Sequence, residues 1–157
     1  MVQKEPSYWL MKSEPDAYSI DNLKNDDVTL WDGIRNYQAR NFMRNMHIRD
    51  KVFFYHSNCK PPGIVGLMEV TDLNIVDPTQ FDKDSKYFDP KSQPENPRWD
   101  CVKVRYLFKS NKILTLPELK ILFSEDELLV VKKGNRLSIL PVRYDVAKKL
   151  LEKIKED

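Results

Sequence analysis

Glycine is scarce in this chain, which has only four glycines among 157 residues, at positions 33, 63, 66 and 134. Glycine-rich phosphate-binding loops need several glycines at fixed spacing, and these four match neither the Walker pattern nor the dinucleotide-binding pattern. We therefore expect no nucleotide cofactor, and the sequence suggests no other cofactor.

Cysteine and histidine are equally rare, with two residues of each type. No spacing among Cys59, Cys101, His47 and His56 matches a zinc-ligand motif, so we expect no metal site. His56 and Cys59 are close enough in sequence to suggest a nucleophilic pair, but side chains at this spacing in a turn diverge and no third group is placed to orient the imidazole. The two cysteines fit the reduced thiols of an intracellular protein, with one disulfide as the open alternative.

Long apolar stretches are also missing. No segment approaches the ~18 apolar residues of a membrane span, and the N-terminus lacks the apolar core of a signal peptide. We expect a soluble protein of the cytoplasm, or of the nucleus if the source is eukaryotic, with no membrane contact. The 26 Lys and Arg nearly balance the 24 Asp and Glu, so only local clusters of charge can indicate a partner.

The chain instead contains a series of short apolar runs. Its 157 residues, of which 41% are hydrophobic, are enough for one domain, residues 1–157, with a buried core. Strands are predicted at 8–11, 51–55, 64–72, 99–108 and 137–141, the last at a sheet edge. The second and third of these form an antiparallel hairpin around the turn Pro61-Pro62-Gly63.

Helical signals lie between and after the strands. Short helices are predicted at 19–23, from Thr115 and at 124–130, and a final helix is predicted from Tyr144. Residues 74–97 contain four prolines and predict a long loop pinned by its aromatic rings. This order of elements indicates an α+β fold with a compact, barrel-like sheet rather than alternating βαβ units.

The stretch 31–46 combines an indole with a basic helix. Its apolar residues recur at helical spacing and form one stripe that faces a core. They are Ala39, Phe42, Met43 and Met46. Segment 31–49 holds four arginines and the single acid Asp32, so its charge of +3 exceeds the +2 of the whole chain. Gly33 allows a sharp turn between the indole and the helix.

Polar groups follow two of the predicted strands, as Lys12-Ser13 and as His56-Ser57-Asn58. Neighbouring strand ends would place these groups at one rim of the sheet, where hydroxyl and amide groups can read the edge of a nucleobase. Trp31 can stack on a base, which is worth about 1–3 kcal/mol, and the arginines can meet phosphates. A structural interpretation stands beside each assignment: Trp31 as a core residue, the arginines as a solvated helix face, and Ser57 with Asn58 as turn formers.

Longer strings of the sequence resemble a known family. The strings YWLMKSEPDAYSID, WDGIRNYQARNFMR, VFFYHSN, PPGIVGLMEV and PRWDCVKVRY occur in this order and resemble the EVE domain family over nearly the entire chain. The resemblance implies a PUA-like fold, a distorted β-barrel flanked by short helices and related to the YTH and ASCH domains. It also implies a pocket for a base flipped out of its strand, with 5-modified cytosine in DNA favoured and modified RNA bases as a further option.

The resemblance and the charge pattern of the basic helix together assign two groups of site residues. The pocket residues are Lys12, Ser13, Trp31, Asp32, Tyr55, His56, Ser57, Asn58 and Trp99. The residues expected to meet phosphates or brace the pocket are Arg35, Asn36, Arg40, Asn41 and Arg44. Asp32 would accept a hydrogen bond from an exocyclic amine or anchor Arg35, and Trp99 would oppose Trp31 or lie in the core.

The function expected from these assignments is non-catalytic. A monomer would bind DNA or RNA at a modified base, held in an aromatic-walled pocket, and one methyl group would add about 1–3 kcal/mol of discrimination. The first alternative is an ASCH-like enzyme acting on a modified nucleoside or small amide through Lys12 and Glu14. The second is a protein-interaction module whose basic helix binds an acidic partner.

Overall fold

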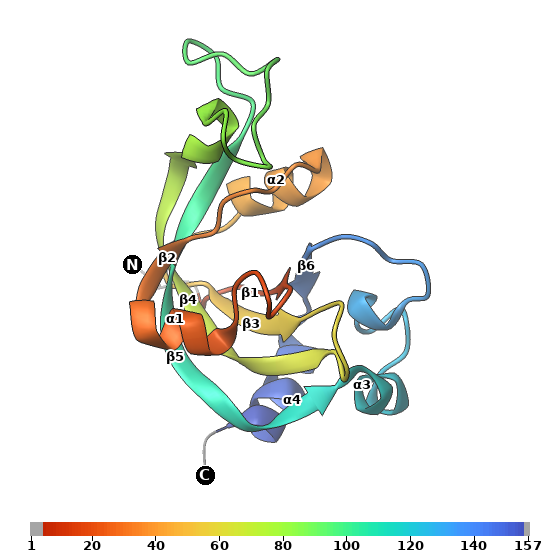
Figure 1. Ribbon diagram of the computed structural model, residues 1–157. Coiled ribbons are helices and arrows are strands. Elements are labelled where there is room, and N and C mark those ends of the chain that lie inside the picture. Colours follow the sequence, from red (N-terminus) through yellow and green to blue (C-terminus); the bar gives the residue numbers. More distant parts are fainter. Residues whose placement is uncertain (1–4, 156–157) are drawn as a thin grey trace.

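The computed structural model describes residues 5–155, which form a mixed six-stranded sheet surrounded by helices (Figure 1). In chain order the elements are β1 (Tyr8–Ser13), α1 (Ile20–Asp26), β2 (Val28–Leu30), α2 (Tyr37–Arg44), β3 (Lys51–His56), β4 (Gly63–Val76), η1 (Pro78–Phe81), β5 (Asp100–Thr115), α3 (Leu116–Leu122), η2 (Leu129–Val131), β6 (Ile139–Val142) and α4 (Tyr144–Ile154). The sheet order is β2-β5-β4-β3-β1-β6. The predicted α+β class is confirmed.

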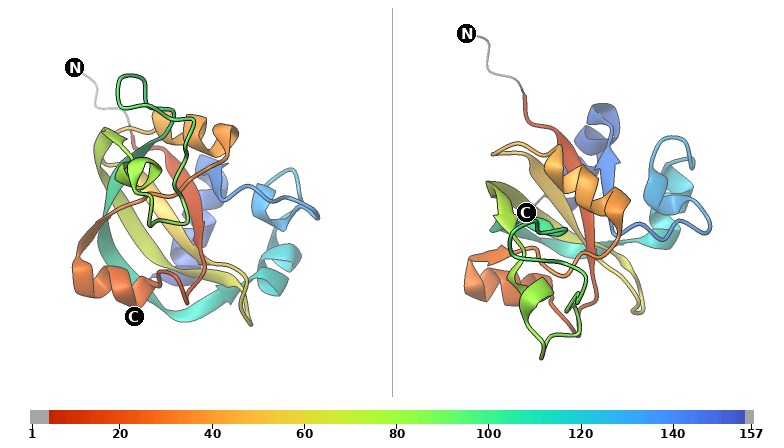
Figure 2. Two further views of the ribbon diagram at one scale, coloured as in Figure 1. Left: turned by 45° about the horizontal axis from the view of Figure 1, so that its top comes forward. Right: turned by 90° about the horizontal axis from the view of Figure 1, so that it is seen from above.

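The central strands are apolar along their whole length because both faces of the sheet are covered. In β1, Tyr8 and Leu10 belong to the core beneath α3 and α4, whereas Trp9 and Met11 belong to the core beneath α1 and α2. The helices accordingly lie on two sides of the sheet (Figures 1 and 2). A strand covered on both faces loses the alternation of polar and apolar residues, which is why 8–11 and 51–55 are continuous apolar runs.

Glycine permits a close backbone contact between β4 and β5, beside the hairpin formed by β3 and β4. The two strands pair antiparallel as predicted. A Cβ atom on Gly66 would lie 2.5 Å from the carbonyl oxygen of Phe108, and the pairing of β4 with β5 shifts register between Ile64 and Gly66. A side chain at position 66 would push β4 and β5 apart.

The connection between β4 and β5 is held mainly by buried polar groups. Gln80 donates from Nε2 to the carbonyl oxygens of Asp77, at 2.7 Å, and Trp99, at 2.6 Å. Its Oε1 accepts from the Ser92 hydroxyl and from the backbone N–H of Trp99. Aromatic packing contributes at Tyr87, whose ring lies against Gly33. The predicted long loop is shorter than expected at its start, because β4 continues to Val76.

Three of the predicted helix starts are confirmed, two of them with the side-chain cap that was expected. The hydroxyls of Ser19 and Thr115 accept the backbone N–H groups of Asn22 and Glu118, and α4 begins at Tyr144. The predicted helix at 124–130 is wrong. One turn closes at Leu128, and the buried side chains of the following 3-10 turn hold the chain against the core instead. The three-residue strand β2 was not predicted.

The sheet has two free edges, β2 and β6, that are not paired with each other. Beyond β2 the chain stays attached to β5 through the N–H of Trp31, which donates to the carbonyl oxygen of Val102 at 2.8 Å. Within residues 5–155, none of the helices is both long and apolar enough to cross a membrane.

Candidate functional site

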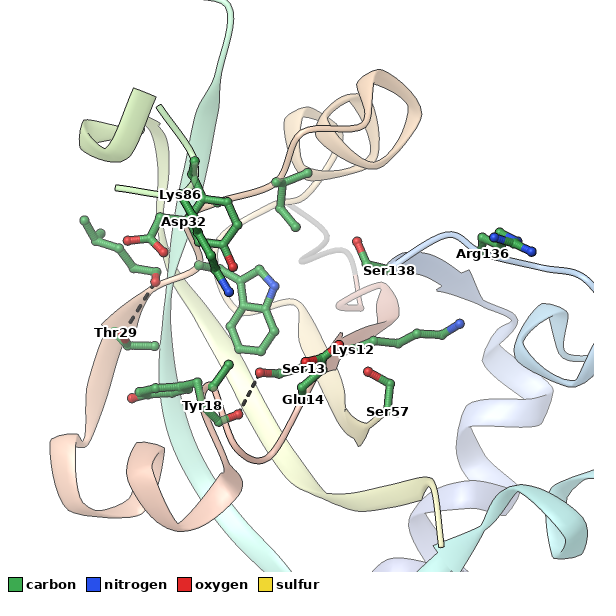
Figure 3. Close-up of a pocket in the computed structure, with 16 residues that line it drawn as sticks. Lys12, Ser13, Glu14, Tyr18, Thr29, Asp32, Ser57, Lys86, Arg136 and Ser138 are labelled. Carbon is green, nitrogen blue, oxygen red and sulfur yellow. Dashed lines mark hydrogen bonds between the residues drawn. The ribbon is translucent and has the colours of Figure 1, made fainter. Parts of the chain in front are cut away.

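A cavity of about 860 Å³ opens between the two free edges of the sheet (Figure 3). Its walls come from the end of β1, from β2 and the turn after it, from the β4–β5 connection, and from the segment before β6. Figure 3 shows Asp32 and Lys86 on one side and Lys12, Ser57 and Ser138 on the other. The cavity is therefore built from segments that are far apart in sequence.

The ends of β1 and β3 meet at this cavity, as predicted from the polar groups that follow them. The strands are parallel neighbours, with Lys12 opposite Tyr55 and Ser13 opposite His56. The backbone N–H of Ser57 donates to the carbonyl oxygen of Ser13 at 3.1 Å. Parallel strands end at the same edge of a sheet, so Ser13 and Ser57 both reach the cavity.

Trp31 forms a wall of the cavity and also packs against the core. Its side chain is 7% exposed and meets the ring of Phe54 edge to face, with centroids 5.4 Å apart. The same residue lines the cavity together with Ser13. An opening therefore exists between Trp31 and Ser13, as a base-binding slot requires.

The indole N–H of Trp31 differs from those of the other two tryptophans. Trp9 and Trp99 donate to the carboxylates of Asp50 and Asp89, whereas Trp31 has no such acceptor within residues 5–155. No fully buried side-chain nitrogen or oxygen in that range lacks a partner, so the Trp31 nitrogen is at least partly exposed. It is a hydrogen-bond donor available to a ligand.

Asp32 lines the cavity but does not anchor Arg35. Arg35 is held by Asp77, with Nη1 and Oδ2 3.1 Å apart and the Asp77 carboxylate almost fully buried. Asp77 also accepts the backbone N–H of Gly33 at 2.8 Å. Partial burial and the nearby Asp77 raise the pKa of Asp32. A hydrogen-bond donor bound in the cavity would stabilise the ionised carboxylate.

Three cations reach the cavity without a carboxylate partner. Lys12, Lys86 and Arg136 take part in none of the six ion pairs within residues 5–155. Burial lowers the pKa of Lys12, whose Nζ lies 5.8 Å from the centre of the Tyr55 ring. An anion bound here would stabilise the charged form of Lys12.

Two predicted pocket residues lie elsewhere. Trp99 stacks on Tyr37 at 4.8 Å and 17° and donates to Asp89, so its ring closes the β4–β5 connection rather than the cavity. His56 turns toward α1, where its Nε2 accepts the backbone N–H of Ile20 at 3.1 Å. Trp99 is thus a core residue, the interpretation that the strand pattern offered equally.

Two more predicted residues, Tyr55 and Asn58, line a second cavity of about 350 Å³. This cavity adjoins the first because Lys12 and Ser57 belong to both. The predicted pocket residues are therefore distributed over two neighbouring cavities. The first holds Lys12, Ser13, Trp31, Asp32 and Ser57.

None of the five residues assigned to phosphates lines either cavity. Arg35 donates to Tyr87, Ile34, Asp77 and Thr79. The remaining four are engaged at or beside α2.

These four residues form contacts within the protein. Asn36 caps the helix by accepting the N–H of Ala39. Arg40 lies over Tyr37 and donates to Asn41 and to the carbonyl oxygen of Arg98. Arg44 pairs with Asp100 at 2.9 Å. The polar face of α2 covers the β4–β5 connection, so these groups brace the fold.

Some of the cavity residues that the sequence reasoning missed lie before α1 and along or just after β2, and the others come from two later segments. Lys86 and Tyr87 lie in the β4–β5 connection, and Arg136 and Ser138 precede β6. Run 132–136, KKGNR, has three cations and no acid. The search for clustered positive charge that singled out segment 31–49 would therefore have found this run as well. No local signal places Tyr87 beside Gly33.

The geometry does not favour catalysis by cysteine or a metal. Both cysteines are free thiols. Partial burial and the nearby Asp16 raise the pKa of the Cys59 thiol, which opposes formation of a nucleophilic thiolate. Within residues 5–155, no group of three or more His, Cys, Asp or Glu side chains could hold a metal ion.

Comparisons with known proteins agree with this architecture. Human thymocyte nuclear protein 1 is 40% identical over 157 residues, covering 88% of this chain and 70% of the relative. The rat protein is 46% identical over 125 residues, covering 73% of this chain and 55% of the relative. The chain thus spans about half the length of the rodent relatives.

Solved structures match the fold closely. A Pseudomonas syringae protein of 42% identity superimposes with a TM-score of 0.89, covering 93% of this chain and 98% of the other. Human THYN1 in complex with 5-methylcytosine containing DNA is 37% identical, with a TM-score of 0.88, and covers 96% of this chain and 99% of the other. The expected PUA-like fold is confirmed by these matches. The EVE domain family model matches residues 7–153, and this chain is therefore a member of the EVE domain family.

Proposed function

We propose that this chain binds DNA at a 5-modified cytosine and holds the extruded base in the cavity beside Trp31. The observation that carries the proposal is the opening between Ser13 and Trp31, a tryptophan whose indole N–H has no hydrogen-bond partner within residues 5–155. It is supported by the human relative that was crystallised with 5-methylcytosine containing DNA. A base inside a duplex cannot reach such a cavity, so it must leave the stack at a cost of a few kcal/mol.

The cavity offers groups that complement the edge of cytosine. The exocyclic amine of cytosine donates hydrogen bonds, and Asp32 is a carboxylate acceptor on the cavity wall. The indole N–H of Trp31 can donate to a ring acceptor of the base. A base that satisfies both groups is preferred over one that leaves either unpaired.

Phosphate contacts in this proposal come from three cavity cations that join no ion pair within residues 5–155, Lys12, Lys86 and Arg136, and not from the arginines near α2. Cations that already hold a carboxylate must give up that partner before they bind a phosphate. Free cations only release counterions from the DNA, and this release makes binding salt dependent.

The direct test replaces Trp31 with Phe, which keeps an aromatic ring in the core and removes the N–H. Binding to single-stranded oligonucleotides that carry cytosine, 5-methylcytosine or 5-hydroxymethylcytosine at one position is measured by fluorescence anisotropy. We expect wild type to prefer a modified base, with about 1–3 kcal/mol between methylated and plain cytosine. Trp31→Phe should bind all three oligonucleotides more weakly than wild type, because each form of cytosine loses the same hydrogen bond, and should retain salt-sensitive binding.

Trp99→Phe is the matched control, because it removes an indole N–H that lies outside the cavity. It should keep the affinity and the base preference of wild type, although loss of the bond to Asp89 lowers its stability. Equal binding of the three oligonucleotides by wild type would overturn the proposal. So would a Trp31→Phe variant that binds all three oligonucleotides as tightly as wild type.

An enzyme is the second candidate because Lys12 and Glu14 both line the cavity and burial lowers the pKa of Lys12. A lysine with a lowered pKa can act as a base or nucleophile. Incubation of wild type and Lys12→Ala with acetylated and methylated nucleosides, followed by chromatography, tests this directly. Turnover by wild type alone would favour the enzyme over the reader.

The proposal extends to the organisation of the chain. The family model covers residues 7–153, and we propose that residues 1–157 form a single domain. Relatives carry the name thymocyte nuclear protein, which supports a nuclear location if this chain comes from a eukaryotic cell.

A further inference from the structure

We propose that the second cavity is a subsite for the nucleotide adjacent to the captured base, on the same DNA strand. This inference rests on the proposed function, because the captured base defines which nucleotide is adjacent. The second cavity has a volume of about 350 Å³ and lies where the ends of β1 and β3 meet the loop between α3 and β6.

The charged residues that line the second cavity are all cations. Its lining includes four lysines, Lys12, Lys120, Lys132 and Lys133. It includes no carboxylate, and none of the four lysines joins an ion pair within residues 5–155. Elsewhere in the same range, Lys51 and Lys109 are paired with acids. Unpaired lysines around a hollow complement a phosphate.

The floor of the cavity is apolar where the rim is basic. Tyr55, Pro62, Leu116, Val130 and Val131 contribute to the lining. Such a floor suits the faces of a base and a deoxyribose, which stack or pack without sequence-specific hydrogen bonds. The apolar floor can hold the base and the deoxyribose, and the cationic rim can bind the phosphate.

The two cavities share Lys12 and Ser57, and this shared boundary places the connecting phosphate. Figure 3 shows the Lys12 side chain extending away from Asp32, on the same side as Ser57 and Arg136. A phosphate that links a base in the first cavity to its neighbour in the second must pass this boundary. There Lys12 and the Ser57 hydroxyl can both donate to it.

The loop before β6 brings the rest of the rim close to the same path. Lys132 and Lys133 are exposed residues of the second cavity, and Arg136 is an exposed residue of the first. One short run therefore supplies cations to both cavities. A strand that crosses from one cavity to the other would follow this run.

The test is a double variant, Lys132→Gln with Lys133→Gln, compared with Lys149→Gln plus Lys153→Gln. The control removes the same charge from exposed positions on α4 that line neither cavity. Probes are a single-stranded 12-mer with one central 5-methylcytosine, the same 12-mer with plain cytosine, and free 5-methyl-2′-deoxycytidine. Affinities are measured over a range of salt concentrations.

We expect the Lys132/Lys133 variant to bind the 12-mers about tenfold more weakly at low salt, with a slope of log affinity against log salt reduced by about 1.4 for two single-strand phosphates. Its preference for 5-methylcytosine and its binding of the free nucleoside should match wild type. The α4 control should keep the wild-type slope. Thermal unfolding should show all variants folded, since exposed lysines are replaced.

The outcomes separate the two proposals. Unchanged 12-mer affinity and slope in the Lys132/Lys133 variant would overturn the subsite, whatever the base preference. An equal loss of 12-mer affinity in the α4 control would also overturn it, because the loss would then follow from the lower net charge of the protein and not from the position of the lysines. Wild type without a preference for 5-methylcytosine would overturn the proposed function instead, even if the slope still fell in the Lys132/Lys133 variant.

Discussion

Two basic segments of this molecule carry similar charge but differ in their surroundings. The helix-side basic cluster consists of Arg35, Arg40 and Arg44, and the loop-side basic cluster consists of Lys132, Lys133 and Arg136. The helix-side cluster faces the β4–β5 connection and the start of β5, where Asp77 and Asp100 pair with Arg35 and Arg44. The loop-side cluster joins no ion pair within residues 5–155 and borders both cavities.

The difference shows that a cluster of cations in a sequence does not by itself identify a phosphate site. What decides is whether the fold brings carboxylates or aromatic faces to those cations. Arg40, for example, lies 4.6 Å from the centre of the Tyr37 ring and donates to a carbonyl oxygen. Paired cations should affect stability when removed, whereas unpaired ones should affect binding.

The largest expected effect comes from Arg35→Ala. This change leaves the buried Asp77 carboxylate without its ion-pair partner, and breaking a buried pair costs about 3–5 kcal/mol. Urea unfolding of the variant and wild type measures the difference. A loss below about 1 kcal/mol together with a reduced salt slope in DNA binding would show that the helix-side cluster binds phosphate after all.

Arg136→Gln tests the loop-side cluster with the opposite expectation. Arg136 is exposed and lines the first cavity, so the free energy of unfolding should change by no more than about 0.5 kcal/mol. Affinity for the 12-mer should fall several-fold, and the salt slope should decrease by about 0.7 for one phosphate. If the free energy of unfolding falls and the salt slope of DNA binding does not change, Arg136 stabilises the fold and does not bind phosphate, and the two clusters do not differ as proposed.

Arg44→Gln is the matched change in the helix-side cluster. Its ion pair with Asp100 is partly exposed, and such pairs contribute about 0–1 kcal/mol. We expect this small loss in urea unfolding and an unchanged salt slope in DNA binding. A slope that falls as much as in Arg136→Gln would remove the distinction between the two clusters.

The smallest expected effect concerns pH and extends the comparison to His56, another engaged residue beside the cavities. Burial lowers the pKa of His56 from 6.5, and its Nε2 accepts the N–H of Ile20. The unfolded chain therefore takes up this proton at higher pH than the folded chain. The stabilisation is full above pH 6.5 and is lost as the pH falls through the folded pKa.

His56→Gln removes the titrating group and checks this expectation. Unfolding free energies of wild type and variant are compared at pH about 7.5 and about 5.5, on either side of the usual histidine pKa. Wild type should lose more stability than the variant over this interval. If wild type and His56→Gln lose the same free energy of unfolding over this interval, the pH dependence comes from the carboxylates and not from His56.

Several features of the fold could be predicted because they depend on near neighbours in the chain. Apolar runs located β1 and β3, and capping groups located the starts of α1 and α3. Tyr144 was recognised as the start of α4. β2 was missed because three half-buried residues carry too little pattern, and their pairing with β5 is a long-range contact.

The amino-acid sequence by itself determined the family, the strand ends that carry Ser13 and Ser57, and the place of Trp31 before a basic helix. Only the tertiary structure decided which charges stay free. Asp77 reaches Arg35 across 42 positions, and Trp99 closes the β4–β5 connection instead of the cavity. Ion pairs and cavities form between segments that are distant in sequence, so local periodicity and spacing do not predict them.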